Sequence, residues 1–188
     1  MIKAIIFDCF GVLYRDNISM LYDAVPLESR QALQDIIHAT DYGFMSREEY
    51  YRDVAALAGK TLDEIRDLES RQHSRDERMI AYSQTFRPQY KVGLLSNIDS
   101  DTIRRLFPNF EELFDVFVVS GDEGVTKPSV EIFEIAAMKL GLKPEECVMI
   151  DDIARNVEGA EMAGMQALLF TTQRQLAQDL PRLLEQYA

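Results

Sequence analysis

The chain has 188 residues, of which 47% are hydrophobic and 28% charged, a composition that favours a folded chain with a sizeable core and excludes a disordered one. Lys and Arg together number 20, against 32 Asp and Glu, which gives a net charge of −12. Because so acidic a chain repels nucleic acids and anionic membrane surfaces, and its basic residues are not clustered, we expect it to bind neither.

The apolar run at residues 1–7 is too short for a secretory signal and ends at Asp8 without a cleavage site. No segment reaches the ~20 apolar residues that span a bilayer. The two cysteines, Cys9 and Cys147, sit in or beside apolar runs and predict core packing rather than a disulfide or a zinc site. We therefore expect a soluble cytoplasmic protein. Nothing in the sequence indicates its oligomeric state.

The first predicted element is a buried strand at residues 3–7, which is short, apolar and rich in isoleucine. From about residue 16 to residue 85 the pattern predicts no strand. Helices are predicted at 29–38, 46–57 and 62–84, and Ser46 with Glu49 is typical of a capping box at the start of the second.

Strands return after Pro88. They are predicted at 91–95, 115–120, 147–150 and 166–170, and they alternate with helices at 100–106, 128–140, 155–163 and 172–186. Pro128 suits the first turn of its helix, and Pro181 predicts a break or restart in the last one.

This alternation predicts an α/β fold with a doubly wound parallel sheet and helices on both faces. Residues 1–14 and 88–188 would form this core, and residues 15–87 a small all-helical cap domain inserted after the first strand. Parallel sheets of this kind bind ligands outside the carboxyl ends of their strands, and we expect the cap to cover that edge as a lid.

Polar residues follow three of the predicted strands directly: Asp8, the pair Ser96-Asn97 and the pair Asp151-Asp152. Each has an ordinary structural explanation by itself, as a turn former or a helix N-terminus, and Lys127 could be a solvated loop lysine. Together they would gather at one edge of the sheet, which favours a functional site there.

Four segments carry this pattern, namely Phe7-Asp8-Cys9-Phe10-Gly11-Val12-Leu13, Leu94-Leu95-Ser96-Asn97, Lys127-Pro128 and Ile150-Asp151-Asp152. In this order they resemble the four motifs of the haloacid dehalogenase-like hydrolases, and the resemblance covers nearly the whole chain, including the helical cap. It implies a Rossmann-like core and a hydrolase in which Asp8 is the nucleophile. The implied cofactor is Mg²⁺, and the implied partner is a small phosphorylated substrate.

The resemblance also implies roles for single residues. Asp8, the backbone carbonyl of Phe10 and Asp152 would hold the metal, with Asp151 either a further ligand or an acceptor behind the ligands. The Ser96 hydroxyl and the backbone N–H of Asn97 would bind phosphate oxygens. Lys127 would act as a point charge on Asp8 and on the transferring group.

Phe10 departs from the family pattern. Most phosphatases of this family carry a second Asp two residues after the nucleophile, and this Asp protonates the leaving group. Phe10 cannot donate a proton, and general acid–base catalysis typically contributes about 10²- to 10⁴-fold in rate.

Three interpretations of Phe10 are open. The first is a phosphatase whose substrate carries a good leaving group, or whose proton comes from elsewhere, with Tyr14 and Asp16 as candidates for substrate contact or proton supply. The second is a metal-independent 2-haloacid dehalogenase-type hydrolase, because halide departs without a proton; it leaves Asp151 and Asp152 unexplained. The third is a catalytically weak protein that binds a phosphorylated ligand or a partner. Asn156 follows Asp152 at a distance that fits either the same site or a helix cap.

Overall fold

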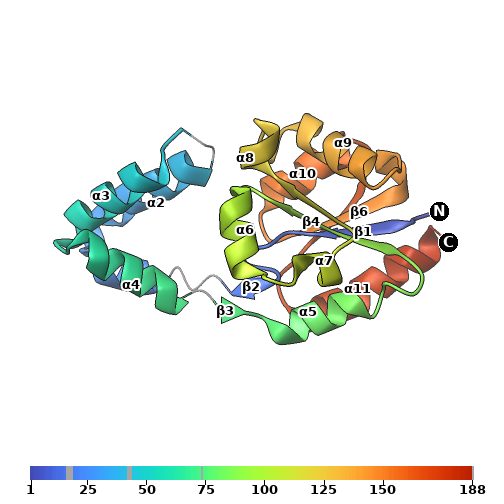
Figure 1. Cartoon of the computed structure of the whole chain (residues 1–188), viewed down its shortest axis with the longest axis horizontal. Helices are drawn as coiled ribbons and strands as arrows, with labels where there is room; N and C mark the ends of the chain where they lie inside the picture. The colour runs from blue at the N-terminus through green and yellow to red at the C-terminus, as the bar shows by residue number, and fades with distance from the viewer. Residues whose placement is uncertain (16–18, 42–43, 73, 188) are drawn as a thin grey trace. The chain divides into compact units, whose positions relative to one another are not determined.

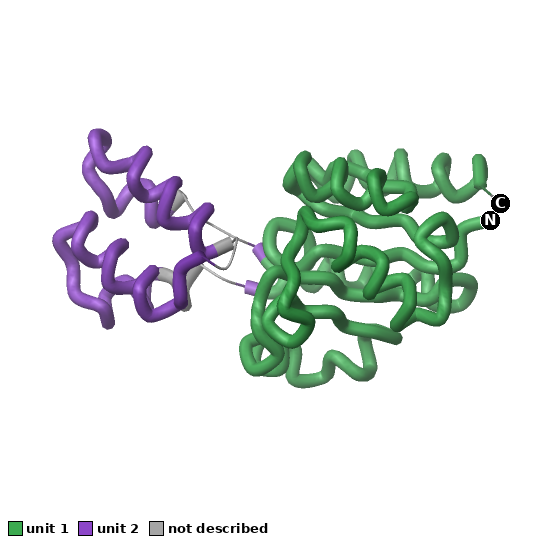
Figure 2. The backbone as a smooth tube through the Cα atoms, turned by 90° about the horizontal axis from the view of Figure 1, so that it is seen from above, with its two compact units in different colours: residues 1–14, 75–188 green, residues 15–74 purple. Residues whose placement is uncertain are grey.

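The computed structural model describes residues 1–15, 19–41, 44–72 and 74–187, and the chain divides into two units, coloured separately in Figure 2. Unit 1 comprises Met1–Tyr14 and Arg75–Ala188, and unit 2 comprises Arg15–Ser74. The sequence prediction assigns residues 75–87 to the helical cap. They belong instead to unit 1, because Met79 and Ile80 of α5 (Glu77–Gln84) are buried in the core of that unit.

A parallel five-stranded sheet forms the centre of unit 1, in the order β5-β4-β1-β6-β7 (Figure 1). The strands are β1 (Ala4–Phe7), β4 (Lys91–Ser96), β5 (Val116–Val119), β6 (Cys147–Asp151) and β7 (Gln166–Leu169). The strand order runs outward from β1 in both directions, so the carboxyl end of β1 is the switch point at which such sheets bind ligands. The predicted doubly wound α/β fold is confirmed.

Helices cover both faces of this sheet (Figure 1). Ile5 and Phe7 of β1 point into one cluster, which α5, α6 (Ser100–Leu106) and α11 (Gln173–Gln186) complete. Ala4 and Ile6 point into the other, which α9 (Val130–Lys139) and α10 (Ala154–Met162) complete. All four residues of β1 are buried, as expected of a parallel strand covered on both sides. Cys9 and Cys147 are buried free thiols, as predicted.

Shorter elements complete unit 1 and its link to unit 2. They are α7 (Phe110–Leu113), α8 (Ser120–Glu123) and the 3₁₀ helix η2 (Pro144–Glu146). β2 (Tyr14–Arg15) pairs with β3 (Ser74–Arg75) where the chain passes between the units. The helix predicted at 62–84 is therefore two helices, because β3 separates α4 (Leu62–Gln72) from α5.

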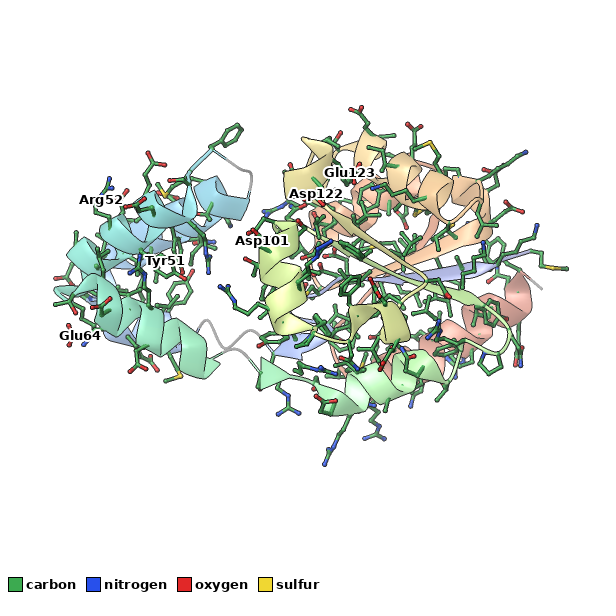
Figure 3. The ribbon with its side chains drawn as sticks, viewed as in Figure 1. Tyr51, Arg52, Glu64, Asp101, Asp122 and Glu123 are labelled. Carbon is green, nitrogen blue, oxygen red and sulfur yellow. The ribbon has the colours of Figure 1, made fainter. Side chains whose placement is uncertain are left out.

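Unit 2 is helical and has its own core. Its other helices are α1 (Ser19–Ala24), the 3₁₀ helix η1 (Leu27–Ser29), α2 (Arg30–Asp41) and α3 (Arg47–Ala58). Leu33, Val54 and Ile65 of successive helices are buried together. Ser46 and Glu49 form the predicted capping box at the start of α3. Tyr51 of α3 faces α4, whose Arg66 guanidinium lies 5.2 Å from the ring centroid (Figure 3).

Both proline predictions were wrong. α9 begins at Val130 rather than Pro128, because Lys127 and Pro128 form a turn closed by a hydrogen bond from Ser129 N–H to the Thr126 carbonyl (2.9 Å). α11 runs through Pro181 without a break. Its buried leucines recur every four residues, and their packing outweighs the hydrogen bond that a proline removes; they are Leu176, Leu180 and Leu184.

Among the residues that the structure describes, no helix combines the length and the apolar character needed to cross a membrane.

The assignment of α5 to unit 1 can be tested through Met79, whose side chain is 2% exposed. Met79→Ala should lower the free energy of unfolding by about 2–5 kcal/mol, because it removes buried methylene groups and leaves a cavity. Met138→Ala, at a helical position that is 66% exposed, is the matched control and should change it by less than about 0.5 kcal/mol. Urea titration followed by circular dichroism measures both, and equal effects of the two variants would contradict the assignment.

Candidate active site

Three neighbouring strands deliver polar side chains to one edge of the sheet. Asp8 follows β1, Ser96 ends β4, and Asp151 ends β6. Phe7 is in register with both Leu94 and Ile150, so Asp8 lies one step beyond that level, beside Asp151. A hydrogen bond from Asp8 N–H to the Ile150 carbonyl (2.9 Å) continues the ladder to this point. The strand ends therefore meet as the sequence predicted.

Lys127 joins this edge from the turn before α9, and its side chain is buried. Its ammonium donates to Asp8 Oδ1 (2.6 Å), to Asp151 Oδ2 (2.6 Å) and to the Leu95 carbonyl (3.2 Å). These three acceptors match the three donors of an ammonium group. Lys127 is thus not a solvated loop lysine: its position is defined by two carboxylates and the end of β4.

The charges of this group perturb one another. Burial raises the pKa of Asp8 well above its usual range; Lys127 lowers it in part, and Asp151 and Asp152 raise it further. Burial alone would lower the pKa of Lys127, but the two carboxylates more than offset this, so its pKa lies above the ordinary value. The ammonium stays charged, and Asp8 shares it with Asp151.

Both carboxylate oxygens of Asp151 accept hydrogen bonds from neighbouring groups. Besides Lys127, its oxygens accept from the backbone N–H of Ile153 (2.9 Å) and from the side-chain amide of Asn156 (3.0 and 3.1 Å). Asn156 is 3% exposed and lies in the first turns of α10. Of the two roles left open for Asp151, this geometry favours the acceptor behind the ligands. Asn156 belongs to the site through Asp151.

Asp152 is exposed, unlike Asp151, and lies against the loop that follows Asp8. A Cβ atom added to Gly11 would be 2.2 Å from Asp152 Oδ2, and Gly11 has a φ of 83°. Only glycine permits both this backbone conformation and this close approach. Gly11 is therefore what lets the carboxylate of Asp152 come near the loop that follows Asp8.

The carboxylate cluster fits a small divalent cation. Asp8, Asp151 and Asp152 each offer an oxygen atom, and these atoms lie within 4.8 Å of one another. Mg²⁺ binds oxygens at about 2.0–2.1 Å, so ligands around one ion stand roughly 3–4 Å apart. Asp8 and Asp151 also share one ammonium, so their two carboxylates carry more negative charge than it offsets, and a divalent cation would balance the rest.

Ser96 is the last residue of β4, and Asn97 directly follows it. The side chain of Asn97 makes a contact that the motif did not predict. Ser96 is 1% exposed. The Asn97 side chain bonds the backbone of Lys127 at both polar groups: Lys127 N–H donates to Oδ1 (2.8 Å), and Nδ2 donates to the Lys127 carbonyl (2.9 Å). The sequence predicted a role only for the backbone N–H of Asn97. It did not predict the side-chain contact with Lys127, because no sequence signal links residues 30 positions apart.

Phe10 packs among aromatic rings. Its ring meets Tyr14 edge-on with centroids 5.8 Å apart, and Tyr14 in turn meets Phe107 at 6.0 Å. Burial, followed by the charge of Cys9, raises the pKa of Tyr14. Tyr14 is therefore a weaker acid than an ordinary tyrosine, which counts against it as a proton donor at neutral pH. Asp16, the other candidate, lies outside the described residues.

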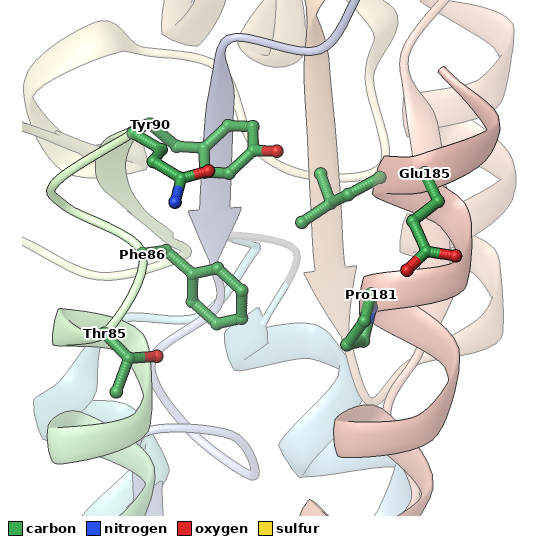
Figure 4. Close-up of a pocket in the computed structure, with 7 residues that line it drawn as sticks. Thr85, Phe86, Tyr90, Pro181 and Glu185 are labelled. Atoms are coloured by element: carbon green, nitrogen blue, oxygen red, sulfur yellow. The ribbon is translucent and has the colours of Figure 1, made fainter. Parts of the chain in front are cut away.

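The pocket in Figure 4 lies away from this site. It has a volume of about 330 Å³ and lies between the end of α5 and α11. Its lining residues are Thr85, Phe86, Gln89, Tyr90, Pro181, Leu184 and Glu185. Tyr90 directly precedes β4, so this pocket is at the amino ends of the strands, opposite the carboxylate cluster.

Comparison with known proteins finds phosphatases among the relatives of the chain. Glyceraldehyde 3-phosphate phosphatase of Methanothermobacter thermautotrophicus is 34% identical over 45% of this chain and 38% of its own length. The enzyme of the same name from Methanopyrus kandleri is 28% identical over 88% and 82%. Phosphoserine phosphatase of Thermus thermophilus is 26% identical over 65% and 53%. The match thus covers less than two thirds of the first and third relatives.

Solved structures share the fold. A predicted HAD-like family hydrolase from Porphyromonas gingivalis has a TM-score of 0.75 at 26% identity, with 98% of both chains covered. A HAD family enzyme from Bacteroides thetaiotaomicron, in complex with magnesium and inorganic phosphate, has a TM-score of 0.71 at 20% identity over 92% and 96%. L-2-haloacid dehalogenase from Xanthobacter autotrophicus, with chloropropionic acid covalently bound, has 0.69 at 19% over 97% and 83%.

The description of the family as a whole agrees with these single comparisons. Residues 2–164, most of the chain, match the model of the haloacid dehalogenase-like hydrolases, and the protein therefore belongs to this family of hydrolases.

Proposed function

We propose that this hydrolase is a Mg²⁺-dependent phosphatase that acts on a small phosphorylated metabolite through an aspartyl-phosphate on Asp8. The observation that carries the proposal is the cluster at the carboxyl end of β1: three carboxylate oxygens within 4.8 Å of one another and one buried ammonium. Relatives named as phosphatases of glyceraldehyde 3-phosphate and phosphoserine support a small phosphorylated substrate.

Each residue has a defined part in the proposed reaction. A carboxylate oxygen of Asp8 attacks phosphorus, the bond from phosphorus to the leaving oxygen breaks, and water then cleaves the aspartyl-phosphate to release phosphate. Lys127 holds Asp8 by its ammonium and offsets charge on the transferring group. The Ser96 hydroxyl and the Asn97 backbone N–H bind phosphate oxygens.

Asp8, Asp152 and the backbone carbonyl of Phe10 would hold Mg²⁺, which when bound neutralises charge on the phosphoryl oxygens. Asp151 orients the site from behind, since its oxygens already accept from Lys127, Ile153 and Asn156. This division explains why two adjacent aspartates differ so much in exposure.

A dehalogenase-type reaction is the second candidate, and the observation that favours it is Phe10. The Phe10 ring packs on Tyr14 and supplies no proton, which halide departure does not need. The charge of the cluster argues against it, because in a metal-independent site Asp8 and Asp151 would share one ammonium and keep an excess of negative charge beside the nucleophile.

Turnover assays decide between these candidates. The purified protein should hydrolyse acyl phosphates and aryl phosphates only with Mg²⁺, and Asp8→Asn should lower kcat by at least about 10³-fold, since an amide is no nucleophile. Colorimetric detection of released phosphate, with EDTA as the metal-free arm, measures this. Halide release from 2-haloacids in EDTA would overturn the phosphatase proposal, and silence in all assays would favour a binding role.

Metal binding can be measured without turnover. Mg²⁺ should raise the melting temperature of the wild-type protein, because a ligand that binds only the folded state stabilises it, by about 2.7 kcal/mol at 100 times its Kd. The increase in melting temperature should be smaller at pH 5 than at pH 7.5, because the pKa of Asp8 is raised and protons then compete with the metal for its carboxylate.

Asp152→Asn should abolish the increase in melting temperature that Mg²⁺ causes, and differential scanning fluorimetry measures that increase. Asp122→Asn, at an exposed aspartate of α8 (Figure 3), is the matched control and should keep the full shift. A full shift in Asp152→Asn would remove Asp152 from the metal site.

Phe10→Asp tests the missing general acid. It should raise kcat on alkyl phosphates, whose leaving groups need a proton, by about tenfold or more, and change acyl phosphate hydrolysis little. Steady-state kinetics on the two substrate classes gives the comparison. No gain, with the Mg²⁺ melting shift intact, would show that another group supplies the proton; no gain with the shift lost would show that the added carboxylate disturbs the metal site.

A further inference from the structure

The side chain of Asn97 makes two hydrogen bonds to one residue of the site, Lys127. Its amide pairs with both backbone polar groups of Lys127, at 2.8 Å and 2.9 Å. Asn97 directly follows β4, so this contact ties the Lys127 turn to the end of a central strand. The Leu95 carbonyl of the same strand accepts from the Lys127 ammonium (3.2 Å). Lys127 is therefore attached to β4 at its backbone and at the tip of its side chain.

The opposite side of the turn is held by α10. A Cβ atom added to Gly159 would be 2.4 Å from the Pro128 carbonyl oxygen, so this helix packs on the turn more closely than any other residue would permit. The same helix carries Asn156, which binds Asp151. The turn thus lies between β4 and α10. Leu95 of β4 accepts a hydrogen bond from the Lys127 ammonium, and Asn156 of α10 binds Asp151, a second acceptor of that ammonium.

The proposed role of Lys127 depends on the position of its ammonium group. Its side chain has four rotatable bonds, and its ammonium meets two carboxylates at 2.6 Å only if its Cα is fixed. A loop residue without such attachment would sample several backbone conformations, and small displacements of a charged group at a reacting centre cost rate.

We propose that the Asn97 side chain is a positioning residue for Lys127: it sets where the ammonium stands between Asp8 and Asp151, and it acts through Lys127 rather than on the substrate. This inference rests on the proposed function, in which Lys127 offsets charge on the transferring group. It is separate from the backbone N–H of Asn97, which any side chain at this position leaves in place.

A double-mutant cycle with Asn97→Ala and Lys127→Ala tests this. Asn97→Ala alone should lower kcat for acetyl phosphate by about 10- to 100-fold, because it displaces the ammonium that offsets charge on the transferring group. In the Lys127→Ala background, the same substitution should have an additional effect of less than about twofold. Effects that multiply would overturn the proposal.

The same cycle is measured with inorganic phosphate in excess Mg²⁺ by titration calorimetry, which needs no turnover. Loss of phosphate affinity on Asn97→Ala only when Lys127 is present supports the proposal, and equal losses in both backgrounds contradict it. If the wild-type protein binds phosphate but hydrolyses no phosphorylated probe, the proposed function fails while this coupling still decides the inference. If Lys127→Ala does not fold, Lys127→Met, which keeps the length of the side chain without its charge, provides the second background, with the same expectation of effects that do not multiply.

Gln84→Ala is the matched control. The Gln84 amide also donates to a distant backbone carbonyl, that of Leu113 (2.9 Å), but at the amino-terminal side of the sheet. It should leave kcat within about twofold of the wild type while lowering the melting temperature. A loss of kcat in Gln84→Ala comparable to that in Asn97→Ala would show that general loosening of the fold, rather than the position of Lys127, governs the rate.

Discussion

The structure of unit 1 depends on one buried ammonium group. Lys127 is 3% exposed, and it is tolerated there because two carboxylates and a backbone carbonyl accept its three hydrogen bonds. Removing one partner of a buried ion pair typically costs about 3–5 kcal/mol, since the other charge is left without compensation. Asp8 and Asp151 are therefore held by Lys127 as they hold it, which would give the proposed nucleophile, Asp8, a defined orientation.

Other features of unit 1 follow from this constraint. Gly11 and Gly159 have no side chain where a methyl group would collide with the Asp152 carboxylate and with the Pro128 carbonyl. The Asn97 amide bonds the Lys127 backbone, and the Asn156 amide bonds Asp151. These residues contribute contacts rather than charge, and Asp152 is the exposed carboxylate of the cluster.

The sequence was enough to predict the strands, their parallel arrangement and the edge at which Asp8, Ser96 and Asp151 meet, because strand periodicity and the switch-point rule are local and general. It was not enough for contacts between residues far apart in the chain, such as Asn97 with Lys127. Tertiary packing also overrode local signals: buried leucines carry α11 through Pro181, and Met79 draws α5 into unit 1. The roles of the site residues remain proposals that rest on this geometry.

At position 10 of the proposed site, charge balance favours an apolar residue, whereas proton transfer to the leaving group favours an acid. A carboxylate at this position would add a negative charge near Asp8, which shares one ammonium with Asp151, and would raise the pKa of Asp8 further. The ring instead packs against Tyr14, and the segment next to Asp8 is apolar, which lowers the local dielectric and strengthens the interaction of Lys127 with Asp8. In the proposed mechanism this arrangement assists attack on phosphorus but not protonation of the leaving group. It therefore selects substrates whose leaving group departs as a stable anion, and acyl phosphates meet that requirement better than alkyl phosphates.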